Sequence, residues 1–191
     1  DPFEGLPRPI FLNVGRVAVE KNIEAFVELD QPGSTVVVGD GPALETLKKK
    51  FPDVHFLGAR FGEDLATYYA SADVFVFPRL TDTFGLVVLE AMSSGTPVAA
   101  FNATGPKDVI PGSNAGTITE LGGDLAAGAK ACLDLERATC RSYAEGYSWK
   151  SVAHAFLENL QPLPTPERRR FWQKLRRKKK TWIDWDQFTD W

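Results

Sequence analysis

The sequence has few of the residues that build metal centres and redox pairs. Its 191 residues include two cysteines, two histidines and one methionine. Cys132 and Cys140 are spaced for neither zinc nor a dithiol pair, so we expect both thiols to be buried or idle. His55 and His154 have no nearby Ser, Cys or second His in the sequence, which favours structural roles and predicts no metal site.

Long apolar runs are also missing. No stretch approaches the ~18 residues that a membrane span requires. With 43% hydrophobic and 25% charged residues, the composition is that of a globular protein with one α/β domain and an appendage. We expect a cytoplasmic location. The stretch "DPFEGLPRP" predicts a Pro-rich linker over residues 1–8, and the absence of an initial Met suggests that more protein precedes it.

Positive charge is concentrated at the end of the chain. Residues 162–191 hold nine Lys or Arg against four acids, a net charge of +5, whereas residues 1–161 carry −8. Six aromatic side chains lie among these basic residues: Phe171, Trp172, Trp182, Trp185, Phe188 and Trp191. Residues 166–191 therefore suit an anionic membrane surface, on the inner face of a membrane, or docking on protein through an aromatic stripe, and these alternatives are level. Nucleic acid is disfavoured because the acidic body would oppose it.

Short apolar runs alternate with helix-patterned segments along residues 9–161. The expected strands are "PIFLNVG", "TVVVGDG", "VHFLGA", "VFVFP", "PVAAF" and "AGTIT". Alternation of this kind predicts an α/β fold, a Rossmann-like doubly wound parallel sheet with helices on both faces. Further helices are expected from about Asp124 to near Leu160, after which "QPLPTP" separates the domain from the basic tail.

Three loops follow strands and are expected on one rim, where open α/β sheets bind ligands. The first contains Gly15, Arg16 and Lys21, which offer a close backbone approach and two cations. The loop before residue 85 opens a helix, whose first N–H groups favour anions. A diphosphate clamp and ordinary solvated loop charges, with Thr83 as a helix cap, explain these loops equally well.

Glu90 favours the clamp. It interrupts the apolar run "GLVVLEAM", where a buried ionised carboxylate requires a partner. About one and a half turns into its helix, it is close enough to the rim to accept hydrogen bonds from the vicinal hydroxyls of a ribose. The alternative is a buried Glu satisfied by backbone amides. Asp82, just before the helix, would face the ligand beyond the phosphates or serve as a turn residue.

The second loop argues against a nicotinamide dehydrogenase. "GDGPAL" begins like a dinucleotide fingerprint, but Leu44 stands where the third glycine or alanine belongs, and Pro42 is an ordinary first helical residue.

Several motifs, in order, resemble one family. "GRVAVEKN", "VVVGDGP", "VHFLGA", "YYASADVFVFP" and "DTFGLVVLEAMSSGTPV" are similar to the C-terminal, donor-binding domain of GT-B glycosyltransferases of family four (group 1), in a bacterial branch. The resemblance spans residues 9 to about 160. It implies one half of a GT-B fold, a UDP- or GDP-linked sugar as donor, retention of configuration, no metal or other cofactor, and an N-terminal partner domain that holds the acceptor.

The resemblance also implies roles for individual residues. Arg16 and Lys21 would bind the donor diphosphate, Glu90 the ribose hydroxyls and Asp82 the hydroxyls of the transferred sugar. The base would lie near Leu57 to Ala59. The full set of implied donor-binding residues is Gly15, Arg16, Lys21, Leu57, Ala59, Thr83, Phe84, Gly85, Leu86 and Glu90, and the implied catalytic residues are Asp82 and Glu90. Asp82 departs from the family pattern, which has Glu at this position.

The sequence therefore predicts the donor-binding half of a retaining glycosyltransferase that moves a hexosyl group to a lipid or saccharide acceptor. Without the partner domain, this chain would bind donor and transfer little. A non-catalytic adaptor of the same fold, which recruits a membrane or protein partner through its tail, is the alternative. A nucleotide-sugar epimerase is a third possibility.

Overall fold

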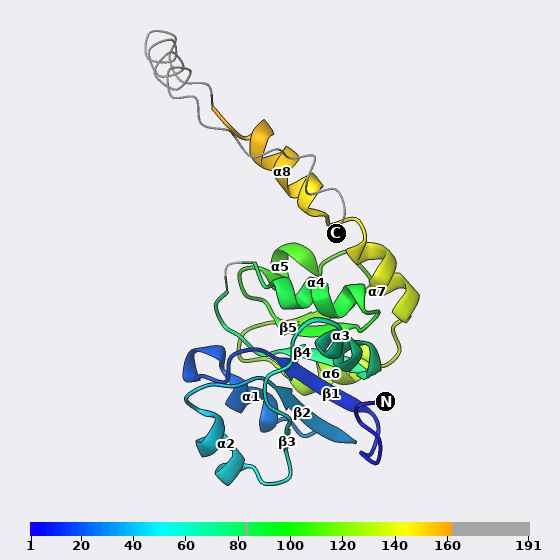
Figure 1. Ribbon diagram of the computed structural model, residues 1–191. Coiled ribbons are helices and arrows are strands. Elements are labelled where there is room, and N and C mark those ends of the chain that lie inside the picture. The colour runs from blue at the N-terminus through cyan, green and yellow to red at the C-terminus, as the bar shows by residue number, and fades with distance from the viewer. Residues whose placement is uncertain (83, 162–191) are drawn as a thin grey trace. The chain divides into compact units, whose positions relative to one another are not determined.

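Six parallel strands form one sheet in the computed structural model, which describes residues 1–82 and 84–161 (Figure 1). The strands are β1 (Ile10–Val14), β2 (Ser34–Val38), β3 (His55–Phe56), β4 (Val74–Phe77), β5 (Val98–Phe101) and β6 (Gly116–Thr119). Their order is β3-β2-β1-β4-β5-β6, the doubly wound order whose direction reverses between β1 and β4. The predicted α/β class, the parallel sheet and the sixth strand are confirmed.

Alternate side chains of each strand enter two separate cores. In β1, Ile10, Leu12 and Val14 contribute to one cluster and Phe11 to the other, because successive side chains point to opposite faces. The central strands have both faces covered, which explains why they are continuous apolar runs.

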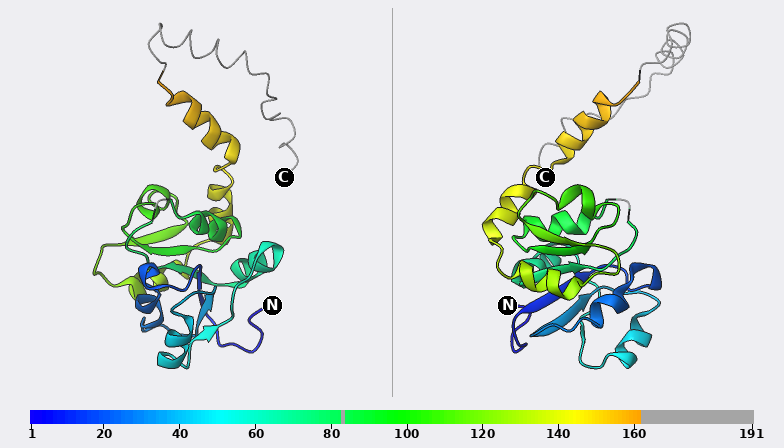
Figure 2. Two further views of the ribbon diagram at one scale, coloured as in Figure 1. Left: turned by 60° about the vertical axis from the view of Figure 1, so that its left-hand side comes forward. Right: turned by 180° about the vertical axis from the view of Figure 1, so that it is seen from behind.

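Helices cover both faces of the sheet (Figures 1 and 2). The cluster that contains Ile10 is covered by α3 (Gly62–Ser71), α4 (Leu86–Ser93), α5 (Pro106–Val109) and α7 (Arg137–Ala144). The other is covered by α1 (Ile23–Val27), α2 (Leu44–Lys50) and α6 (Leu125–Cys132), and a short 3-10 helix η1 (Val19–Lys21) precedes α1. Cys132 and Cys140 are buried, one in each cluster, as predicted.

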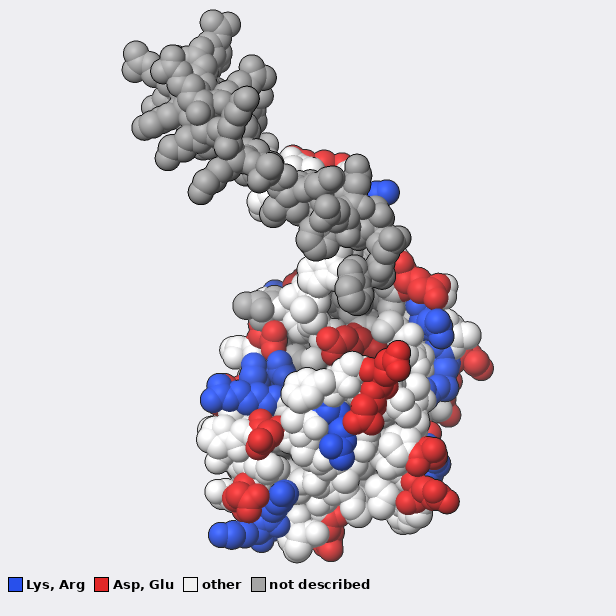
Figure 3. Space-filling view, viewed as in Figure 1, with Lys and Arg blue, Asp and Glu red and all other residues white. Residues whose placement is uncertain are grey.

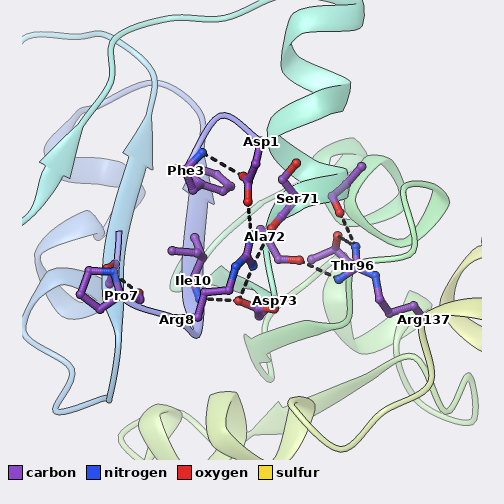
Figure 4. Close-up of polar contacts among 12 residues, drawn as sticks. Asp1, Phe3, Pro7, Arg8, Ile10, Ser71, Ala72, Asp73, Thr96 and Arg137 are labelled. Carbon is purple, nitrogen blue, oxygen red and sulfur yellow. Dashed lines mark hydrogen bonds and ion pairs between the residues drawn. The ribbon is translucent and has the colours of Figure 1, made fainter. Parts of the chain in front are cut away.

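The predicted linker contacts the domain closely (Figure 4). The Arg8 guanidinium lies 2.7 Å from an Asp1 carboxylate oxygen and 2.9 Å from an Asp73 carboxylate oxygen. The same Asp73 oxygen accepts the Ile10 backbone N–H at 2.6 Å. Phe3 is buried and packs edge-on against Tyr68, with ring centroids 5.5 Å apart. Residues 1–8 thus belong to the compact unit Asp1–Ser148.

A second unit begins at Trp149, within the stretch that the sequence analysis assigned to the domain. Its described part is α8 (Trp149–Glu158), so α6, α7 and α8 occupy the predicted helical stretch from about Asp124 to near Leu160. Over residues 1–82 and 84–161, no helix has the length and apolarity that crossing a bilayer requires. Thr83 and the tail, including the membrane and docking predictions for residues 166–191, lie outside the described residues.

Candidate functional site

The three predicted loops meet at the carboxyl end of the sheet. Two backbone hydrogen bonds join the first loop to the second: Gly15 N–H donates to Val38 O at 3.0 Å and Val17 N–H donates to Asp40 O at 2.9 Å. The first loop is also bonded to the loop after β4, because the Asn22 side-chain amide donates to Pro78 O at 2.8 Å. The sheet topology therefore brings these loops together on one rim.

The glycines of "GDG" have a packing explanation. A Cβ built on Gly39 would lie 1.8 Å from the Gly15 carbonyl oxygen, so no side chain fits where the first two loops touch. This G-x-G therefore serves loop-to-loop contact.

Arg79 is a site residue that the sequence analysis missed. Its guanidinium stacks on the Phe77 ring, with Cζ 4.8 Å from the ring centroid, and its Nη1 lies 2.5 Å from Asp82 Oδ2. A Cβ on Gly15 would come within 2.5 Å of Arg79 Nη2. The Arg79 and Asp82 side chains are only 10% and 12% exposed. The Arg79 guanidinium therefore lies against the first loop at Gly15, where the absence of a side chain leaves room for it.

Lys21 and Arg16 differ in their placement. Lys21 Nζ lies 3.9 Å from Asp82 Oδ2 and its side chain is half-buried, so it joins the cluster formed by Arg79 and Asp82. Arg16 is 65% exposed and pairs with Glu20 at 3.6 Å. The structure thus brings Lys21 and Asp82 together, whereas Arg16 extends from the rim into solvent.

The helix after the fourth strand begins without a side-chain cap. Gly85 occupies the N-cap of α4 in the left-handed region, at φ 75°, and glycine has no side chain to accept the first N–H groups of the helix. Val88 N–H donates to Gly85 O at 2.8 Å, so the amides of Leu86 and Val87 and the positive end of the helix dipole are the groups suited to an anion. Phe84 and Leu86 flank the N-cap and are exposed.

The burial expected for Glu90 is wrong. Glu90 is exposed, because α4 turns Val88, Ala91 and Met92 toward the core and leaves Glu90 on its outer side. Its Oε2 accepts a hydrogen bond from the hydroxyl of Tyr69 at 3.1 Å. The carboxylate is therefore not sealed among backbone amides, and its partner in the domain is a phenol that the sequence analysis did not identify.

A pocket of about 280 Å³ lies beside Glu90. Gly62, Leu65, Ala66 and Tyr69 of α3 line one side, and Glu90 with Ser93 and Ser94 line the other. Its lining sets apolar α3 side chains opposite a carboxylate and two serine residues.

The loop after β3 places Leu57 and Ala59 beside the second loop. Leu57 N–H donates to Val37 O at 3.0 Å, and Gly58 O accepts from Gly39 N–H at 2.9 Å. Leu57 is half-buried against the core and Ala59 is exposed. This loop leads directly into α3, which lines the pocket.

Charge on the face seen in Figure 3 is mixed, with acidic and basic side chains interspersed. Within the part of the chain that the structure describes, no group of three or more His, Cys, Asp or Glu side chains is arranged to hold a metal ion. The candidate site is thus a rim of cations and backbone amides next to a pocket with one carboxylate.

The fold and site define an α/β domain with clustered cations at the carboxyl end of its sheet. Residues 8–137 match the family described as Glycosyl transferases group 1, and the chain belongs to that family. The chain is 46% identical over 109 residues to sulfoquinovosyl transferase SQD2 of Arabidopsis thaliana, an alignment that covers 54% of this chain and 21% of that protein.

A second relative is the GDP-mannose-dependent alpha-mannosyltransferase of Mycobacterium tuberculosis, 42% identical over 117 residues, with 60% of this chain and 31% of the relative covered. Among solved structures, Anabaena Alr3699/HepE in complex with UDP and glucose superposes with a TM-score of 0.66 at 20% identity, covering 80% of this chain and 48% of that one. The likeness to that structure concerns the fold. The chain spans about a third or less of the length of the two curated relatives. Both curated relatives are named as transferases, which does not favour the alternative of a non-catalytic adaptor.

Proposed function

We propose that this domain binds the nucleotide-diphosphate sugar donor of a retaining glycosyltransferase that moves a hexosyl group to a lipid or saccharide acceptor. The observation that carries the proposal is the convergence of Lys21, Arg79 and the uncapped start of α4 at one rim. Cations and free amides together are the chemistry that a diphosphate requires. The name of the mycobacterial relative and the UDP in the Anabaena structure agree with such a ligand.

The proposed donor lies across the rim with its diphosphate at Lys21 and the start of α4, and Arg16 reaches it from solvent. Backbone from Thr83 to Leu86 contacts phosphate and sugar. Asp82, which is oriented by its ion pairs, accepts hydrogen bonds from the hydroxyls of the transferred sugar.

The nucleoside half occupies the pocket between α3 and α4. Glu90 accepts hydrogen bonds from the two ribose hydroxyls, and the base rests near Leu57 and Ala59. Both implied catalytic residues thus act by binding, since Asp82 holds the sugar and Glu90 holds the ribose. The acceptor and the groups that activate it come from a partner domain.

Calorimetric titration with UDP, GDP and inorganic diphosphate tests this proposal. We expect Lys21→Ala to weaken UDP, GDP and diphosphate alike, by about tenfold, because it removes a cation from the shared diphosphate site. Glu90→Ala is expected to weaken UDP and GDP much more than diphosphate. Arg141→Ala is the control, since Arg141 is exposed and pairs with Glu145 on α7. Absence of UDP and GDP binding to the unmodified chain at millimolar concentration would overturn the proposal.

The basic aromatic tail is proposed to hold the protein at an anionic membrane, on the cytoplasmic side, near a lipid acceptor. Each Lys or Arg close to such a surface contributes about 1 kcal/mol. We expect the full chain to sediment with phosphatidylglycerol vesicles and a chain lacking residues 166–191 to remain in the supernatant. Equal sedimentation of the two chains would rule out membrane binding by the tail and favour docking on protein.

A further inference from the structure

Tyr69 stands out because its ring is in the core while its hydroxyl reaches the candidate site. The residue is 2% exposed, and its ring packs edge-on against Phe75 with centroids 5.6 Å apart. Its carbonyl oxygen accepts the Thr96 hydroxyl at 2.5 Å. The ring is therefore held by the core, and the backbone of the same residue is held by Thr96.

The hydroxyl of this fixed ring donates to Glu90 Oε2 at 3.1 Å. Glu90 is exposed, and an exposed glutamate ordinarily samples several rotamers. A donor held in the core restricts that freedom and turns one carboxylate oxygen toward α3. Among the hydrogen bonds of the described residues, none engages Oε1, so that oxygen stays available to a ligand in the pocket.

The Tyr69 hydroxyl keeps its proton at neutral pH. Burial raises the pKa of Tyr69 far above its usual range, and the neighbouring Glu90 charge raises it further. The hydroxyl thus remains a donor.

We propose that Tyr69 is a positioning residue, whose hydroxyl presets the Glu90 carboxylate to read the vicinal diol of a ribonucleotide in the pocket between α3 and α4. The inference rests on the proposed function and adds to it a residue that helps the site distinguish ribose from 2′-deoxyribose. A carboxylate that is already oriented loses less conformational entropy when a ligand binds. The resulting gain in affinity is limited to ligands that offer both ribose hydroxyls to Glu90.

The structural explanation of the same contact is that a buried phenol needs an acceptor and Glu90 supplies it. The two explanations differ in what removal of the hydroxyl changes. If the contact only satisfies Tyr69, its loss lowers stability and weakens all nucleotides equally. If the contact presets Glu90, its loss weakens ribonucleotides selectively.

The experiment compares the affinities of UDP and 2′-deoxy-UDP, and of GDP and 2′-deoxy-GDP, for the full chain by calorimetry. We expect the unmodified chain to prefer the ribonucleotide by about tenfold or more, since a hydrogen bond to a charged group is at stake. Tyr69→Phe is expected to reduce this preference roughly threefold to tenfold, because it deletes one hydroxyl and keeps the packed ring. Glu90→Ala should abolish the preference, and Tyr69→Phe in that background should then add nothing.

Tyr68→Phe is the matched control. Tyr68 is the adjacent residue on α3, is similarly buried, and accepts a hydrogen bond from Arg60 at 3.2 Å. We expect its removal to leave the ribose preference unchanged.

The outcomes separate the inference from the proposed function. An unchanged preference in Tyr69→Phe, or equal weakening of ribo- and deoxyribonucleotides, overturns the role of Tyr69 while the donor site stands. If the unmodified chain binds none of the four nucleotides, the proposed function fails and the inference fails with it. A loss of preference in Tyr68→Phe as large as in Tyr69→Phe also overturns the inference, since it would show an effect of the helix as a whole.

Discussion

The ion pair between Arg79 and Asp82 allows a quantitative prediction about how the rim is held together. The two side chains are nearly buried, and Arg79 Nη1 lies 2.5 Å from Asp82 Oδ2. Arg79→Met keeps an aliphatic chain to pack on Phe77 but removes the charge. The Asp82 carboxylate would then face Lys21 at 3.9 Å without the guanidinium.

The magnitude follows from the burial of the pair. Removing one partner of a buried ion pair costs about 3–5 kcal/mol, because the remaining charge stays out of water. For Arg79→Met we expect about 3 kcal/mol, the lower end of this range, since Lys21 still faces the carboxylate. Adding Asp82→Asn removes the buried carboxylate charge that lost the Arg79 guanidinium, so the double variant should recover about 2 kcal/mol.

Urea unfolding followed by far-ultraviolet circular dichroism measures these differences. Arg16→Met is the control: Arg16 is 65% exposed, and its loss should change the free energy of unfolding by no more than about 0.5 kcal/mol. Equal small effects of Arg79→Met and Arg16→Met, or a double variant less stable than Arg79→Met alone, would refute the argument that a buried pair fixes the rim.

Two further predictions concern the loops and the thiols. Gly39→Ala should destabilise the domain by at least about 2 kcal/mol in thermal melts, because the new Cβ would collide with the Gly15 carbonyl. Gly122→Ala controls for backbone strain, because its Cβ meets open space and only its positive φ of 82° opposes a side chain; it should cost less, and an equal loss would contradict this explanation. Burial raises the pKa of the Cys132 thiol to about 11, so little thiolate is present at pH 8 and iodoacetamide should label Cys132 far more slowly in the native chain than in urea. Mass spectrometry of the labelled chain measures both rates, and similar rates would contradict the burial.

Much of the fold could be predicted because the strands are buried on both faces. Strands such as β1 and β4 are continuous apolar runs, and turn residues separate them from the helices. The strand order was not predicted, since hydrophobic periodicity records which face of an element is buried but not which strands pair. The four-residue helix Pro106–Val109 was also missed because it is too short to show a period.

The site was predicted less completely. Arg79 follows a proline in a loop, where an isolated cation usually indicates a solvated surface, and only the fold places it on Gly15 and Asp82. The burial of Glu90 was overestimated because Leu86, on the outer side of the same helix, is also apolar although it is 50% exposed. An apolar side chain on the exposed side of a helix hides the amphipathic pattern that would show which way the helix faces. The roles proposed for these residues stay predictions until ligands are measured.

The helix α4 connects the two ends of the proposed donor site. Its N-cap Gly85 and the Glu90 side chain are five residues apart, which corresponds to a rise of about 7.5 Å. Val88, Ala91 and Met92 anchor this segment in the core, so the distance is set by a fixed backbone and not by a loop. A ligand that carries a diphosphate and a diol at matching separation contacts both the start of α4 and Glu90, and it loses translational freedom only once. Diphosphate or a nucleoside alone contacts only one of the two. Selection for the whole nucleoside diphosphate would then follow from the length of one packed helix.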